Sequence, residues 1–372
     1  MNEVKAKKKV SFEEIAVKAL RGIVAAFKRS SILLSALSLI MSLIVCAIVI
    51  LICGYSPLEA YGAMVKGAFG SSYNLAQTLG TTIPLIFSGL AMAVAARVGV
   101  FNIGIEGQML VGSFVAALVG HYVTGLPAVL HLPIAILSGA LMGGFWALIA
   151  AWLKNRLRIN EVILTIMLNY VAQYLVSYLV TNPFHAEGNV VRTEDVLATA
   201  RLSTLVPHTR LYTGIFLAIL AAVLLYLVLM KTKFGYELRA VGSNANAAES
   251  AGINSKKYIL WAMFLSGAFA GLGGAGEVLG YWGYYIPSMT AGYGFDGIAI
   301  ATMGRNNPFG TVVSAFLFGA LRNGSTGMNR STNIPGELIQ VLQALVILFV
   351  STPGIIRYIQ KKVAGRKGGK TA

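Results

Sequence analysis

Charge is scarce in this chain, and acidic charge is scarcest. Of its 372 residues only 12% are charged, and just 14 are Asp or Glu. Soluble globular domains carry a charged share of about 25%, so the composition excludes a soluble enzyme, a disordered chain and a nucleic-acid-binding domain. Instead, 56% of the residues are hydrophobic and the mean hydropathy is +0.71. These values are typical of a polytopic helical membrane protein.

Cysteine and the familiar catalytic motifs are also nearly absent. The two cysteines, Cys46 and Cys53, lie in one apolar stretch, so we expect neither a disulfide nor a metal site. The sequence has no Walker A motif, no HExxH motif and no nucleophile elbow. We therefore expect no catalytic residue and no cofactor in this chain. If the chain transports a solute, the energy must come from a partner or from an ion gradient.

Basic residues are the one abundant kind of charge, and they gather at the two ends. Thirty Lys and Arg against 14 acids give a net charge of +16. Basic clusters that flank apolar spans mark the cytoplasmic side of a membrane and are attracted to anionic lipid. We therefore predict a basic cytoplasmic N-terminal segment over 1–31 and a basic cytoplasmic tail over 352–372.

The stretches between the charges divide the predicted membrane domain, 32–351, into about ten spans, where a full crossing needs roughly 20 residues. With both termini inside, the 182–210 segment is extracytoplasmic, and it is either a docking surface or an ordinary solvated loop. The 231–257 segment is then a cytoplasmic loop. The predicted spans lie at 32–53, 75–96, 107–125, 132–153, within 162–186, and at 211–230, 258–280, 292–303, 308–321 and 335–350.

A short internal sequence similarity suggests two pseudo-repeated halves. In each half a glycine-broken segment that carries an acid follows a Ser-Gly pair, over 88–108 and again over 266–298. Interrupted segments at corresponding positions of two halves indicate a translocation pathway near the repeat interface. The predicted fold is therefore all-α, with about ten transmembrane helices in two related halves.

Four acids lie within or beside the predicted spans. A charge at the bilayer centre costs about 2.5–3.5 kcal/mol on insertion scales, so such acids are functional candidates. Glu161 follows Asn160 at the start of a span and is explained as a helix-start residue, while Glu277 near the outer end of a span is open to solvation. Glu106 and Asp296 lie among glycines that break the helix, where the open backbone must line a wet cavity or be buried in protein.

Amide side chains accompany these acids. Asn102, Gln108 and Asn169 lie in or beside apolar runs. They suit either the hydroxyls and ring nitrogens of a polar, uncharged solute or hydrogen bonds between helices, which contribute around 0.6 kcal/mol each. Together with Glu106 and Asp296 they form the predicted substrate pathway.

The 231–257 loop contains a predicted short helix. Asn244 is placed to cap a helix that continues through Ala251, and Gly252 is placed to end it. Ala247, Ala248 and Ala251 give this helix a small-residue face. Such a helix either docks in a groove of another protein or merely connects two spans.

This loop resembles the coupling loop of ABC-transporter permeases, in which Ala247-Ala248-Glu249 is followed by Gly252. The residues assigned to coupling by this resemblance are Asn244, Ala247, Ala248, Glu249, Ala251 and Gly252. The chain as a whole resembles the branched-chain amino acid, simple sugar and nucleoside permease family, and two of its stretches look most like the nucleoside branch. The matching stretches are 101–110, 160–170 (NEVILTIMLNY), 238–244, 294–300 and 304–308, of which 160–170 and 294–308 resemble the nucleoside branch.

The resemblance implies a permease subunit of an importer in a bacterial cytoplasmic membrane. It implies a partner ATPase that holds ATP and Mg, a second and different permease, and an extracytoplasmic substrate-binding protein, with nucleosides as the solute. A permease for a simple sugar such as ribose or galactose is the alternative within the family. An ion-coupled secondary transporter that uses the four acids is the alternative of another class.

Overall fold

The computed structural model describes residues 31–157, 159–287, 289–290 and 292–332, and then 334–335, 338, 341–342, 344–345 and 348–349. The predicted basic tail 352–372 and nearly all of the basic segment 1–31 lie outside these residues, as does about half of the predicted span 335–350. The described residues are helical and contain no strand, only an isolated bridge between Thr204 and Tyr212. The predicted all-α class is thereby confirmed.

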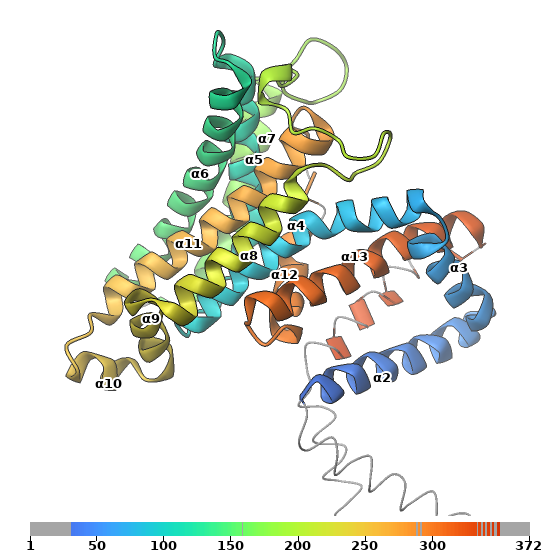
Figure 1. The fold of residues 1–372 in the computed structure, drawn as a ribbon, viewed down its shortest axis with the longest axis horizontal. Helices are drawn as coiled ribbons and strands as arrows, with labels where there is room; N and C mark the ends of the chain where they lie inside the picture. Colours follow the sequence, from blue (N-terminus) through green and yellow to red (C-terminus); the bar gives the residue numbers. More distant parts are fainter. Residues whose placement is uncertain are drawn as a thin grey trace, which may run out of the picture.

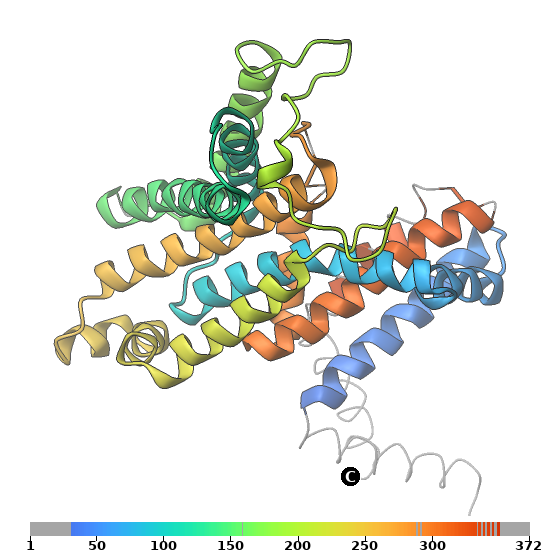
Figure 2. The same cartoon turned by 45° about the horizontal axis from the view of Figure 1, so that its top comes forward.

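Most of the predicted spans correspond to single helices (Figures 1 and 2). The helices are α2 (Ser31–Ile52), α3 (Pro57–Phe69), α4 (Ser72–Arg97), α5 (Ile105–Tyr122), α6 (Ala128–Leu157), α7 (Glu161–Thr181), η1 (Ala198–Ala200), α8 (Gly214–Lys231), α9 (Lys233–Ser243), α10 (Ala245–Ser250), α11 (Ser255–Gly276), the π-helix η2 (Glu277–Trp282), α12 (Tyr293–Met303) and α13 (Pro308–Ser331).

Five helical stretches of the described chain are long and apolar enough to cross a membrane: α4, α6, α7, α8, and α11 continued by η2. The count of ten spans and the two-half repeat therefore stay predictions. Three helices of the described chain differ clearly from the expected pattern. The sequence predicted neither α3 nor α9, and α13 runs to Ser331, well past the predicted end at 321.

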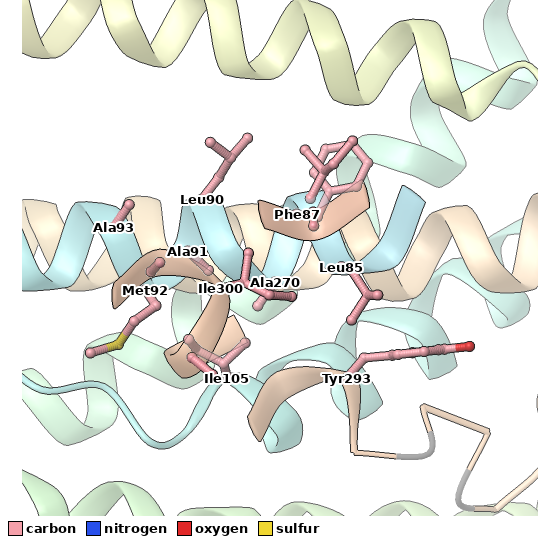
Figure 3. Close-up of a cluster of buried hydrophobic side chains, with 14 of the residues drawn as sticks. Leu85, Phe87, Leu90, Ala91, Met92, Ala93, Ile105, Ala270, Tyr293 and Ile300 are labelled. Atoms are coloured by element: carbon pink, nitrogen blue, oxygen red, sulfur yellow. The ribbon is translucent and has the colours of Figure 1, made fainter. Parts of the chain in front are cut away.

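Helix α4 forms the centre of the molecule. Its first turn is capped by the Ser71 side chain, which accepts from the backbone N–H of Asn74. From Thr78 to Ala95 almost every residue is buried, because α11, α12 and α13 all pack against it. In Figure 3, Leu85 and Phe87 of α4 lie in one apolar cluster with side chains of α5, α11 and α12. A helix that is apolar all round is expected to be enclosed in this way.

Glycines bring α11 against α6 and α5. A Cβ atom on Gly143 of α6 would lie 2.4 Å from the carbonyl oxygen of Gly267, and one on Gly271 would lie 2.2 Å from that of Gly139. On α5, a Cβ atom on Gly112 would lie 2.6 Å from the Cα atom of Gly271. Small residues at such contacts allow the helix backbones to touch.

The molecule has two distinct ends. Helices α9 and α10 project at one end of α8 and α11, and the 182–210 loop lies at the opposite end (Figure 1). Helices α2, α3 and the last turns of α13 stand together to one side (Figure 2). Helix α4 contacts α3 and α13 of this side group and also α8 and α11. It therefore links the side group to the rest of the molecule.

Candidate functional site

A polar cavity of about 790 Å³ opens between α3, the first turns of α4 and the last turns of α13. Its lining is rich in cations and tyrosines. The residues that carry this character are Lys66, Tyr73, Arg210, Tyr281, Tyr293, Arg322 and Arg330. A cavity of this size, with a few convergent polar groups, is the default binding-site hypothesis in a protein without a ligand.

One wall of the cavity is built on Arg210, which ends the 182–210 loop. Its Nη2 atom lies 2.5 Å from Oε2 of Glu277, the first residue of η2, and its guanidinium lies 4.2 Å from the ring centroid of Tyr281. Burial lowers the pKa of Arg210, but the Glu277 carboxylate and the surrounding tyrosines together raise that pKa above its ordinary value. Arg210 is therefore a cation at any physiological pH.

A second arginine repeats this arrangement on the α13 side of the cavity. Nε of Arg322 lies 2.7 Å from Oδ2 of Asp296 on α12, and its guanidinium lies 4.5 Å from the ring centroid of Tyr293. As at Arg210, the acid lies on another element and the tyrosine lies within one turn of that acid. The two buried acids offset the charge of the two arginines.

The remaining cations leave the cavity positive. Among the described residues, Lys66 and Arg330 have no acid within the 4.0 Å ion-pair distance. Tyrosine rings and guanidinium planes offer flat surfaces on which a planar ring stacks, and cationic N–H groups donate to carbonyl oxygens and ring nitrogens. The cavity is therefore suited to a solute with a flat ring and hydrogen-bond acceptors.

The predicted pathway amides do not line this cavity. Asn102 donates to Gln108 Oε1 (3.0 Å) and to Ser266 Oγ (2.8 Å), and both side chains are almost fully buried. Asn169 accepts from the backbone N–H of Gly107 (2.8 Å) and donates to the carbonyl oxygen of Ile103 (2.9 Å). These contacts follow the interhelical alternative for the amides, and a pathway role for them stays a prediction.

The two predicted pathway acids lie close together. Glu106 accepts from Thr290 Oγ1 (2.5 Å) and from the backbone N–H groups of Gly292 (3.1 Å) and Gly294 (2.7 Å), so it fixes the chain that enters α12. Asp296 follows in the first turn of α12, 8% exposed, and reaches the cavity through its ion pair with Arg322. Of the five predicted residues, Asp296 is the one joined directly to the cavity lining.

The other two acids are also paired. Glu161 begins α7 behind the Asn160 cap, as expected of a helix-start residue, and lies 3.2 Å from Lys154 Nζ. The expectation that Glu277 is open to solvation is wrong, because its exposed fraction is 0%. Its carboxylate is enclosed where α11 continues into η2 and where Arg210 folds back on it. Each of the four acids that the sequence singled out therefore already has a partner.

The predicted short helix in the 231–257 loop is confirmed as α10. Asn244 Oδ1 accepts from the backbone N–H of Ala247 (3.1 Å), and Gly252 has φ +82°, a left-handed conformation that favours glycine. Ala248 is buried against the rest of this chain, whereas Ala247, Ala251 and Glu249 are exposed. Glu249 accepts from Ser255 Oγ at the start of α11 and so ties α10 to that helix.

The geometry thus defines a multi-pass helical membrane protein with a polar cavity and a separate helical projection at one end. Residues 74–351 match the family model described as branched-chain amino acid transport system / permease component. The chain belongs to this family of ABC transporter permeases. Such subunits are not enzymes, and ATP hydrolysis belongs to a partner ATPase.

Three similar proteins extend over nearly the whole chain. The guanosine ABC transporter permease protein NupP of Bacillus subtilis is 39% identical over 338 residues, which cover 90% of this chain and 97% of that protein. The glucose ABC transporter permease protein TsgB13 of Haloferax volcanii is 35% identical, with 90% and 91% covered. The nucleoside ABC transporter permease protein NupB of Lactococcus lactis is 32% identical, with 92% and 97% covered. No solved structure matches the chain.

Proposed function

We propose that this chain is the permease subunit of an importer that moves nucleosides into a bacterial cell across the cytoplasmic membrane. The observation that carries the proposal is the 39% identity to a guanosine permease across 97% of its length. The cavity supports it, since tyrosine and guanidinium planes suit a nucleobase. The solute passes through the cavity, and Arg210, Tyr281, Tyr293 and Arg322 contact it.

The proposed importer contains a second, different permease. Bacillus subtilis has a guanosine permease NupQ beside NupP, and Lactococcus lactis has a nucleoside permease NupC beside NupB; they are 26% and 32% identical to this chain over shorter matches. The partner ATPase binds ATP and Mg and contacts the exposed side of α10. A substrate-binding protein delivers the nucleoside to the 182–210 loop on the outer face.

Uptake in cells tests the nucleoside assignment. Cells with and without this chain are given labelled guanosine, alone and with excess unlabelled ribose. Loss of guanosine uptake on deletion, restored by the chain on a plasmid and unaffected by ribose, is the expected result. Guanosine uptake that is equal in both strains would contradict the proposal.

A simple sugar is the second candidate solute, because a glucose permease is 35% identical to this chain over 91% of its length. Tyrosine, arginine and amide side chains also suit sugar hydroxyls. Labelled glucose, ribose and galactose are therefore tested in the same two strains. Sugar uptake that depends on the chain, together with unchanged guanosine uptake, would favour this candidate.

A further inference from the structure

Arg210 lies where three parts of the molecule meet. Its backbone N–H donates to Gln77 Oε1 on α4 (3.1 Å), its side chain pairs with Glu277 on η2, and α8 begins shortly after it at Gly214. Helix α4 leaves room for it, since a Cβ atom on Gly80 would lie 2.4 Å from the Arg210 carbonyl oxygen. One residue therefore connects the 182–210 loop, the cavity wall and the end of α11.

The loop is attached to η2 by backbone contacts as well. The N–H of Leu202 donates to the carbonyl oxygen of Leu279 (2.8 Å), and the N–H of Val196 donates to that of Gly283 (2.7 Å). Tyr212 packs so closely that a Cβ atom on Gly280 would lie 2.4 Å from its ring. A displacement of η2 therefore displaces the loop, and the reverse also holds.

The hydrogen bonds around Glu277 are incomplete. Glu277 Oε1, Arg210 Nε and the Tyr212 hydroxyl are buried and lack a hydrogen-bond partner among the described residues. Unpaired polar atoms destabilise the arrangement that leaves them unpaired, and π-helical turns often occur at functional positions. A shift that brought the Tyr212 hydroxyl to Glu277 Oε1 would satisfy two of these atoms at once.

Helices α8 and α11 carry α9 and α10 at the ends that lie away from Arg210 and Glu277. Helix α8 ends at Lys231, directly before α9 begins at Lys233, and α11 begins at Ser255, shortly after α10 (Figure 1). At their other ends Arg210 and Glu277 bind each other. Helices α8 and α11 are thus linked at both ends, by α9–α10 at one end and by a buried ion pair at the other.

We infer that the Arg210–Glu277 ion pair is a clasp that makes α8 and α11 move together. A displacement of α9 and α10 by the ATPase then reaches the cavity wall through Arg210 and the stacked Tyr281. The inference rests on the proposed function in one respect, the contact between α10 and the ATPase. Arg210 is in this scheme a positioning residue as well as part of the cavity lining.

Cysteine labelling in the assembled transporter tests the clasp without depending on the solute. Cys46 and Cys53 are replaced by alanine, and Thr326→Cys, an exposed position in the cavity lining, is labelled with a membrane-impermeant maleimide. The labelling rate is measured with and without a non-hydrolysable ATP analogue and Mg. In this parent we expect the analogue to change the rate about fivefold or more, the usual size of coupling between two sites.

Variants of the ion pair are compared with this parent. Arg210→Gln and Glu277→Gln should each remove the ATP-dependent change, and Arg210→Lys should retain most of it. The double variant Arg210→Gln with Glu277→Gln should behave like either single variant. It leaves no unpaired buried charge, so it tests the clasp even if a single variant fails to assemble. The matched control is Lys154→Gln, which breaks an ion pair whose cation has the same 22% side-chain exposure as Arg210 and lies outside the cavity lining.

The outcomes separate the clasp from the proposed function. An ATP-dependent change that persists in Arg210→Gln and Glu277→Gln, or in the double variant, overturns the clasp and leaves the permease assignment intact. A parent that shows no ATP-dependent change overturns both the clasp and the contact of α10 with an ATPase. If Lys154→Gln also removes the ATP-dependent change in labelling rate, that loss reflects a general loosening of the structure. This result would also overturn the clasp.

Discussion

Glu106 shows how one side chain in this protein serves the backbone. Its carboxylate accepts from two backbone N–H groups and one hydroxyl where the chain turns into α12, and the first N–H groups of a helix have no partner within that helix. A carboxylate that accepts several such bonds holds its donors firmly. The acid that the sequence indicated as a pathway residue thus has a structural duty in addition to any contact with solute.

Glu106→Gln tests, at the residue scale, whether the carboxylate holds the backbone at the start of α12. The amide has one acceptor oxygen in place of two, so at least one backbone N–H loses its partner, and we expect a destabilisation of about 1–3 kcal/mol. The measurement is the thermal unfolding of the purified transporter. Glu187→Gln, an exposed change in the 182–210 loop, is the control and should leave the unfolding temperature unchanged. Equal effects of the two changes would contradict this account.

The cavity residues show why the sequence revealed only part of the site. Acids inside apolar stretches are costly and therefore visible, so Glu106 and Asp296 were identified. Arg210 and Arg322 were treated as charges that mark the ends of spans. Their pairing with Glu277 and Asp296 joins residues 67 and 26 positions apart, and no local pattern reports it. Tyrosine beside an apolar run is ordinary in membrane proteins, so Tyr281 and Tyr293 carried no signal.

At the scale of the helix, the use of charged residues as span boundaries explains where the predicted elements end. The predicted span 308–321 ends before Arg322, but α13 continues to Ser331, and Asp296 compensates that arginine within the protein. Helix α3 escaped prediction because Glu59 and Lys66 interrupt its apolar residues. Helix α10 was predicted correctly, since its Asn cap and Gly terminator are local signals.

A matched pair of glycine changes tests the contact between α6 and α11. Alanine is the better helix former by about 0.8–1.0 kcal/mol, so Gly143→Ala would stabilise α6 if nothing opposed it. Because the new Cβ would lie 2.4 Å from the carbonyl oxygen of Gly267, we expect a net loss of about 1–3 kcal/mol from overpacking. Gly62→Ala on α3, where a Cβ meets no atom within 4 Å, should be neutral or stabilising. Thermal unfolding of the purified transporter distinguishes the two, and an equally mild Gly143→Ala would refute the close contact.

The exposed face of α10 gives a second prediction for a helix. Ala247 points away from the chain, whereas Ala248 is buried in it. Ala247→Trp should therefore leave the fold intact and weaken the contact with the ATPase, lowering ATPase stimulation by solute-loaded binding protein by about tenfold, the effect of 1.4 kcal/mol. The measurement is ATP hydrolysis by the reconstituted complex, compared with Leu137→Trp, an exposed position on α6 that lies outside both α10 and the 182–210 loop. Undiminished stimulation in Ala247→Trp would remove α10 from the contact.

For the whole molecule, the pairing of the acids bears on whether uptake is driven by ATP or by an ion gradient. Glu106, Glu161, Glu277 and Asp296 are all held by ion pairs or backbone donors, which favours structural roles for them over ion coupling. We expect uptake to persist when an uncoupler collapses the ion gradients while ATP is maintained, and to stop when ATP is depleted. Labelled guanosine uptake under the two conditions is the measurement. Collapse with the uncoupler alone would restore the ion-coupled alternative.

The glycine contact of α11 with α5 and α6 also bears on how the helices move against each other. Backbone meets backbone at Gly112, Gly139, Gly143, Gly267 and Gly271, and the side-chain atoms closest to these glycines are the Cβ atoms of alanines. Interlocked side chains resist axial sliding because each step requires new rotamers, whereas smooth backbone surfaces do not. These glycines therefore hold α11 at a short distance from α5 and α6, and at these positions few side chains oppose a lengthwise displacement.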